Sequence, residues 1–129
     1  GPALVGKFFI PLLDSHSPSV MAFLSARVGS ISDNRLGGWH AYRSSKASLN
    51  MIIKNFSLEV SRTNKQASII GLHPGTVNTE LSKPFQKNVA ERKLFSPEFS
   101  AGAMAKVIDN LKQEDTGSVL AFDGSKIES

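Results

Sequence analysis

The sequence contains no cysteine among its 129 residues. This absence excludes a disulfide framework and thiolate metal sites, and it is typical of a protein from a reducing compartment, so we expect a cytoplasmic location. Long hydrophobic runs are missing too: Lys7 and Asp14 interrupt the most apolar early segment, which stays well short of the roughly 20 apolar residues of a membrane span. We therefore expect no membrane partner.

Charge of one sign is present in small excess, with 15 Lys and Arg against 11 Asp and Glu. The basic residues are scattered singly or in pairs, and they form no stripe interleaved with aromatic residues, which would indicate a nucleic-acid surface. We predict no nucleic-acid partner. His40 and His73 stand too far from each other and from carboxylates at ligand spacing to indicate a metal site.

The length of 129 residues and the 40% hydrophobic composition are sufficient for one globular core and short for two. The chain opens on Gly1, in a stretch that already has the pattern of a folded segment and lacks the features of a signal sequence. We interpret residues 1–129 as a single, incomplete domain.

Apolar residues at helical spacing predict helices over 1–13, 40–62 and 97–112. The first has a broad apolar face that we expect to be buried, and Pro11 should kink its last turn. Ser96 is expected to cap the third helix. The expected inward residues of the second and third helices are Leu49, Ile52, Ile53, Phe56 and Val60, then Ala101, Met104, Ala105, Ile108 and Leu111.

Short apolar runs predict three strands, over 20–24, 67–72 and 118–122. The first run is continuously apolar, which is typical of a parallel strand covered on both faces. With the helix over 40–62, the first two strands form a βαβ unit with parallel strands and a right-handed crossover. The alternation predicts an open α/β sheet, in which ligands bind beyond the carboxyl ends of the strands.

Tyr42 and Lys46 lie four residues apart in the stretch YRSSK, so a helix places both side chains on one face. An ammonium ion about 4 Å from a phenolate stabilises it by on the order of 4 kcal/mol at an effective dielectric constant of about 20. The pair is therefore a candidate acid–base device. On spacing alone we favour the alternative, a surface tyrosine beside a solvated lysine, because this spacing recurs by chance.

The stretches YRSSKASLN, HPGTVNTEL and GSVLAFDG, in this order, resemble the short-chain dehydrogenase/reductase family, and within it the C-factor and carbonyl-reductase-like branch. The resemblance extends over essentially the whole chain. It implies the carboxyl-terminal part of a Rossmann-like, doubly wound parallel sheet, with three strands and flanking helices, from which the amino-terminal cofactor half is absent.

The resemblance implies an NAD(P)-dependent oxidoreductase that interconverts carbonyl and alcohol groups of a small-molecule substrate. Tyr42 would be the acid and base, and Lys46 would assist its ionisation and bind the nicotinamide ribose. Residues 81–95 would form the substrate loop, and the helices over 1–13 and 40–62 would make the interface of a homo-oligomer. The residues at the nicotinamide end would be Tyr42, Lys46, Pro74, Gly75, Val77 and Thr79.

Three departures from the family pattern set limits on this function, one of them being that the asparagine of the family's catalytic tetrad would precede Gly1. Ala26 occupies the usual place of the catalytic serine, and Ser25, one position away, is our candidate for the catalytic hydroxyl. Ser30 and Ser32 could replace it only if their loop folds back. The glycine-rich turn that grips the dinucleotide would precede Gly1, so we expect only the nicotinamide end of the NAD(P) site. Ala26 also supports the alternative of a non-catalytic interaction or signalling protein of the same fold.

Overall fold

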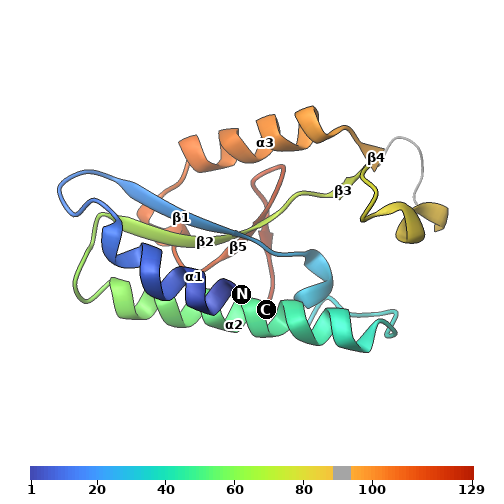
Figure 1. Ribbon diagram of the computed structural model, residues 1–129, viewed down its shortest axis with the longest axis horizontal. Coiled ribbons are helices and arrows are strands. Elements are labelled where there is room, and N and C mark those ends of the chain that lie inside the picture. Colours follow the sequence, from blue (N-terminus) through green and yellow to red (C-terminus); the bar gives the residue numbers. More distant parts are fainter. Residues whose placement is uncertain (89–93) are drawn as a thin grey trace.

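The computed structural model describes residues 1–88 and 94–129. Figure 1 shows a central sheet with helices on both faces: α1 and α2 cover one face, and α3 covers the other. The elements are α1 (Pro2–Phe9), η1 (Ile10–Leu12), β1 (Ser19–Leu24), η2 (Arg27–Gly29), α2 (His40–Val60), β2 (Ala67–His73), β3 (Thr76–Val77), η3 (Lys83–Asn88), β4 (Leu94–Phe95), α3 (Pro97–Asp109), η5 (Gln113–Asp115), β5 (Val119–Ala121) and β6 (Lys126–Ile127).

The main sheet has the strand order β1-β2-β5-β6. β1 and β5 both pair with β2 in parallel, and β6 returns antiparallel to β5. The predicted α/β class with a parallel sheet of three strands is confirmed, and so is the βαβ unit of β1, α2 and β2. The short strand β6 and the separate parallel pair of β3 with β4 were not predicted.

Each face of β2 contributes to its own part of the core. Ile69 faces α2 and packs with Ile53, and both side chains are fully buried. Ile70 faces the other way, toward Val107 of α3. This alternation follows from the two-residue period of a strand, so both faces of a strand between two helical layers are largely apolar.

The predicted burial of the first helix is wrong. Leu4, Phe8 and Leu12 are 61%, 64% and 76% exposed, and the one buried residue of α1 is Gly6. α1 packs through this glycine, because a Cβ atom there would lie 2.3 Å from the ring of Phe56. The kink at Pro11 is confirmed, since the α-helix ends at Phe9 and continues as the 3-10 turn η1.

Two further burial predictions need correction. β1 is an edge strand among the described residues. Met21 packs on the α2 side and Val20 on the α3 side, but Leu24 is 61% exposed, so the predicted cover of β1 on both faces is only partial. In α3, Ala101 and Ala105 face solvent, while Ser100 and Val107 are buried. The Ser96 cap is confirmed, because its hydroxyl accepts a hydrogen bond from the Phe99 amide. Within the described ranges, no helix has the length and apolar character needed to cross a bilayer.

Candidate functional site

The structure brings Tyr42 and Lys46 together at the start of α2, next to the carboxyl end of β1. The Lys46 ammonium donates a hydrogen bond of 2.9 Å to the carbonyl oxygen of Leu24, and its nitrogen lies 5.9 Å from the centre of the Tyr42 ring. Tyr42 is 45% exposed, so its phenol is accessible from solvent. A lysine anchored to the strand beside an accessible phenol is an arrangement that can transfer a proton to a bound ligand.

The loop before α2 is held in an unusual backbone conformation. Gly37, Gly38 and Trp39 have φ angles of 63°, 70° and 48°, in the left-handed region that favours glycine. The Arg43 guanidinium fixes this turn, because it donates hydrogen bonds to the carbonyl oxygens of Val28, Gly37 and Gly38. The position of Tyr42 is therefore set by contacts on both sides of it in the sequence.

Close packing also joins the 3-10 turn η2 to α2. Gly29 touches the backbone of Lys46 so closely that a Cβ atom at this position would lie 2.7 Å from the Lys46 carbonyl carbon. Only glycine fits this contact without a shift of the helix or the turn. The turn after β1 therefore helps to place Lys46 beside Leu24.

Ser25 is 4% exposed and points toward α2, on the same side of the strand as Phe23. Its hydroxyl donates to the side-chain oxygen of Asn50, eight residues beyond Tyr42, and its amide donates to the carbonyl oxygen of Leu72. The hydroxyl thus joins β1 to α2. The assignment of Ser25 as a catalytic residue stays a prediction, and the adjacent Ala26 is 8% exposed.

The two other candidate hydroxyls serve the loop between η2 and α2. Ser30 is 2% exposed, and its oxygen accepts a hydrogen bond from the Asp33 amide. Ser32 lies 3.4 Å from Ser30, oxygen to oxygen, and its amide donates to the carbonyl oxygen of Ser129. These bonds stabilise the loop itself and hold it to the last residue of the chain.

The turn that follows β2 brings the second group of predicted residues to the same edge of the sheet. Gly75 has a φ angle of 76°, and a Cβ atom there would lie 2.6 Å from the ring of Phe95. Val77 lies in β3 and pairs with Phe95 of β4. The Thr79 hydroxyl accepts from the Ser82 amide at 3.4 Å, so this threonine caps the following turn.

The residues that hold this turn were missed by the sequence analysis. Ser100 is 2% exposed and donates a hydrogen bond of 2.8 Å to the carbonyl oxygen of Pro74. Phe95 lies against Phe122 and Phe99, with ring centres 4.6 Å and 4.8 Å apart. A serine on the apolar face of a helix was the available signal for Ser100, but its partner is 26 residues away. Residues 89–93 of the predicted substrate loop lie outside the described residues.

His73, the last residue of β2, is a half-buried imidazole whose Nδ1 atom has no hydrogen-bond partner among the described residues. Burial lowers its pKa to about 4 from the ordinary 6.5; the positive charge of Arg27 acts in the same direction, and Asp123 opposes both. The imidazole is therefore neutral at pH 7. It adds no charge to the edge of the sheet where Tyr42 and Gly75 are found.

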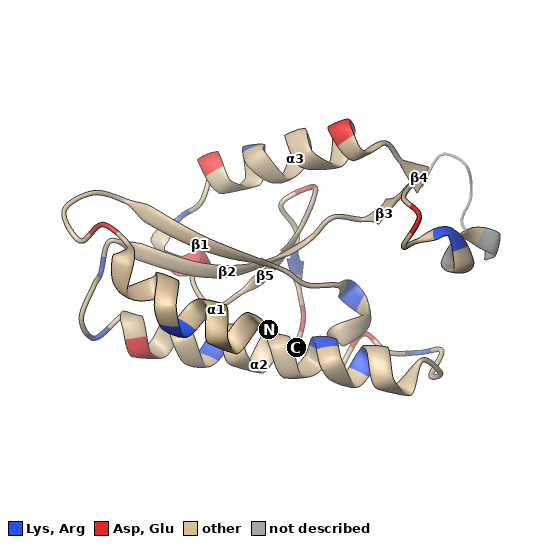
Figure 2. Cartoon of the chain, in the orientation of Figure 1, with Lys and Arg blue, Asp and Glu red and all other residues tan. Residues whose placement is uncertain are grey.

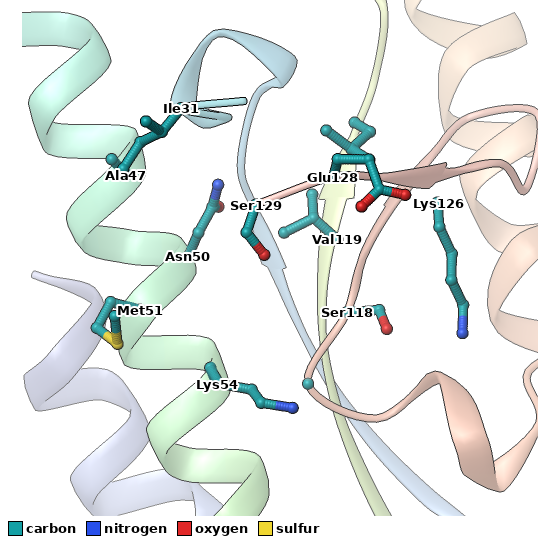
Figure 3. A pocket seen from close by; sticks show the side chains of 13 residues that line it. Ile31, Ala47, Asn50, Met51, Lys54, Ser118, Val119, Lys126, Glu128 and Ser129 are labelled. Carbon is teal, nitrogen blue, oxygen red and sulfur yellow. The ribbon is translucent and has the colours of Figure 1, made fainter. Parts of the chain in front are cut away.

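A cavity of about 350 Å³ lies on the α2 side of the sheet, between that helix and the strands β5 and β6. Figure 3 shows Lys54, Ser118 and Lys126 along it, and Asn50 projecting from α2. The lining includes none of the predicted site residues, so the cavity is separate from the candidate site at the carboxyl ends of β1 and β2. In Figure 2, basic and acidic residues are both spread over the helices and turns.

Known proteins of similar sequence align with almost the whole chain. No family model matches the sequence. C-signal of Myxococcus xanthus is 32% identical and aligns with 98% of the chain and 71% of that protein. The 1-hydroxy-2-glutathionyl-2-methyl-3-butene dehydrogenase of Rhodococcus sp. is 36% identical over 99% of the chain and 54% of the enzyme. An uncharacterized oxidoreductase of Schizosaccharomyces pombe is 35% identical over 98% of the chain.

Solved structures of carbonyl reductases are also similar to the chain. The carbonyl reductase Sniffer of D. melanogaster superposes with a TM-score of 0.84 at 25% identity, over 99% of this chain and 52% of that one. An NADPH-bound carbonyl reductase from chicken fatty liver also gives a TM-score of 0.84, at 27% identity over 99% of this chain. The chain spans about half the length of most of these proteins.

Proposed function

The chain belongs to the short-chain dehydrogenase/reductase family, and we propose that it forms the catalytic half of an NAD(P)-dependent oxidoreductase that interconverts a carbonyl and an alcohol. The observation that carries this proposal is the placement of Lys46 between the carbonyl oxygen of Leu24 and the ring of Tyr42. Residues 1–129 form one incomplete domain in this proposal.

Tyr42 is the proposed proton donor and acceptor. In the direction of reduction, the hydride for the carbonyl carbon would come from a bound nicotinamide, which Lys46 and the turn at Gly75 would hold. The Tyr42 hydroxyl gives its proton to the carbonyl oxygen, so the product is an alcohol and the phenol becomes a phenolate. Lys46 stabilises that phenolate by its charge, and oxidation of the alcohol reverses each of these steps.

The proposed binding place of the nicotinamide end of the cofactor is the carboxyl end of the sheet, where β1 and β2 both end. Gly75 lets the backbone turn with a positive φ at the end of β2, and Lys46 offers an ammonium group from the other side. The proposed contacts are Tyr42, Lys46, Pro74, Gly75, Val77 and Thr79. In this proposal the adenine and pyrophosphate are held by residues outside the 129, since the chain covers about half of its relatives.

A homo-oligomer is a further part of the proposal. α1 and α2 lie side by side in Figure 1 and are in contact, and Leu4 and Phe8 of α1 and Met51 of α2 are exposed apolar residues. An apolar face of this kind is typical of a surface that packs against another copy. We propose α1 and α2 as that interface.

A non-catalytic interaction protein is the second candidate. Ala26 supports it, because the usual serine is missing and the Ser25 hydroxyl is engaged by Asn50. It ranks below the oxidoreductase, since most of the compared proteins are named as oxidoreductases, dehydrogenases or carbonyl reductases.

The test is a fluorescence titration with NADH and NADPH, on the 129-residue chain and on the natural protein with any residues that precede Gly1. We expect binding by the longer protein. In that protein, Tyr42→Phe should lower turnover of a carbonyl substrate by about 10²- to 10⁴-fold, because phenylalanine has no hydroxyl proton to donate while the cofactor still binds.

Ser44→Ala is the matched control, since Ser44 is exposed on α2 between the two proposed residues. It should leave both turnover and cofactor binding unchanged. Absence of NAD(P)H binding by the longer protein would contradict the oxidoreductase proposal and favour the interaction protein. Full turnover by Tyr42→Phe would contradict the assignment of Tyr42.

A further inference from the structure

The turn at Pro74 and Gly75 lies between two separate sheets. β2 belongs to the main sheet and ends at His73, while β3 begins at Thr76 and pairs with β4 alone. Pro74 has no amide hydrogen, and Gly75 has a φ of 76°, so the turn has few backbone groups with which to hold itself. Its geometry depends on what packs against it.

Ser100 supplies the polar contact. Its side chain is on the buried face of α3, seven residues before Val107, and is 2% exposed. A serine inside a helix commonly returns its hydrogen bond to its own helix. Ser100 instead donates to the carbonyl oxygen of Pro74 at 2.8 Å, across 26 residues of sequence.

Phe95 supplies the apolar contact on the other side. Its ring lies where a side chain of residue 75 would otherwise be, at 2.6 Å from an ideal Cβ atom. The Phe95 carbonyl oxygen accepts from the Asn78 amide at 2.8 Å, so the backbone after the turn is fixed as well. The turn is thus held by α3 through a hydrogen bond and by β4 through an aromatic ring.

We infer that Ser100 is a positioning residue for the nicotinamide end of the site, acting through the carbonyl group of Pro74. This inference rests on the proposed function, which assigns Pro74, Gly75, Val77 and Thr79 to that end. Loss of the Ser100 hydroxyl leaves the Pro74 carbonyl without this partner and lets the Pro74–Gly75 peptide rotate. Cofactor binding should then weaken more than the proton transfer at Tyr42 slows.

The experiment compares Ser100→Ala with Ser96→Ala in the natural protein. Both substitutions remove one serine hydroxyl and one hydrogen bond from α3, but the Ser96 bond caps the helix at the Phe99 amide and does not reach Pro74. We expect Ser100→Ala to raise the KM and Kd for the preferred nicotinamide cofactor by about five- to tenfold, with kcat changed less than about twofold. Ser96→Ala should lower Tm and leave the KM unchanged.

Amide hydrogen exchange provides a second measurement that needs no cofactor. The Asn78 amide, which donates to Phe95, should exchange faster in Ser100→Ala than in wild type and in Ser96→Ala. If wild type binds cofactor and the two variants have the same KM, the inference is overturned while the proposed function stands. If wild type binds no cofactor, the proposed function fails, and equal Asn78 exchange in the two variants would also overturn the role of Ser100 in holding the turn.

Discussion

β1 and β2 are neighbouring strands with similar apolar sequences, yet their environments differ. They pair in parallel from Ser19 with Ala67 to Leu24 with Leu72. β2 lies between β1 and β5, and Ile69 and Ile70 are completely buried. β1 is at the edge of the described sheet, and Leu24 is 61% exposed. An apolar run therefore predicts a parallel strand, but it does not reveal on how many sides the strand is covered.

The largest effect expected from this difference is on stability. Ile70→Ala should lower the free energy of unfolding by about 2–5 kcal/mol, because a fully buried side chain leaves a cavity between β2 and α3. Leu24→Ala in β1 should change it by less than about 0.5 kcal/mol, since most of that side chain is in water. Urea denaturation measures both changes, because a shift of the unfolding midpoint at a constant m value reports a change in the free energy of unfolding. Equal losses would show that β1 is covered in solution.

The carboxyl end of β2 is expected to make stability depend on pH. Burial lowers the pKa of His73 to about 4, whereas the unfolded chain takes up the same proton near 6.5. Between these two values the unfolded state binds more protons, so the free energy of unfolding rises with pH. The contribution is complete above pH 6.5 and is lost toward pH 4, for a total of about 3 kcal/mol.

Unfolding measurements at pH 7 and pH 4.5 on wild type and His73→Gln test this dependence. The variant should lose most of the slope, because glutamine does not titrate. His16→Gln is the control, since the His16 side chain is 94% exposed next to Asp14. An unchanged slope in His73→Gln would contradict the assignment of this pH dependence to His73.

Regular elements of the fold follow from the sequence because they depend on local periodicity. The three predicted strands and the helix α2 appear within a few residues of their predicted bounds. β3, β4 and β6 have two residues each, too few to show a period. The predicted inward face of α3 is wrong at Ala101 and Ala105. The polar residue Ser100 is buried instead, where its hydroxyl donates a hydrogen bond to the Pro74 carbonyl oxygen.

The candidate site shows the same limit of local reasoning. The contact of Lys46 with the Tyr42 ring follows from their spacing of four residues on a helix. The bond from Lys46 to Leu24 and the bond from Ser25 to Asn50 join residues 22 and 25 positions apart. Such pairs depend on how β1 docks against α2, which no periodicity in the sequence encodes.

The smallest effect on stability is expected from a substitution in β1, which also tests the unpaired side of this strand most directly. Its unpaired side offers backbone amide and carbonyl groups to another chain, so we expect the 129-residue chain to self-associate at micromolar concentration. Ala22→Lys places a charge on this exposed strand and should shift the chain toward monomer in size-exclusion chromatography, with stability changed by less than about 0.5 kcal/mol.

Leu4→Lys on α1 separates this edge from the apolar helical face. Leu4 is 61% exposed, so its replacement also costs little stability, but it charges the proposed interface of α1 and α2 instead of the strand. If Ala22→Lys alone gives monomer, chains associate through β1. If Leu4→Lys alone does so, they associate through the helices, and the open edge of β1 is not what distinguishes it from β2 in solution. A sharp monomer peak for wild type would exclude both surfaces as sites of association at that concentration.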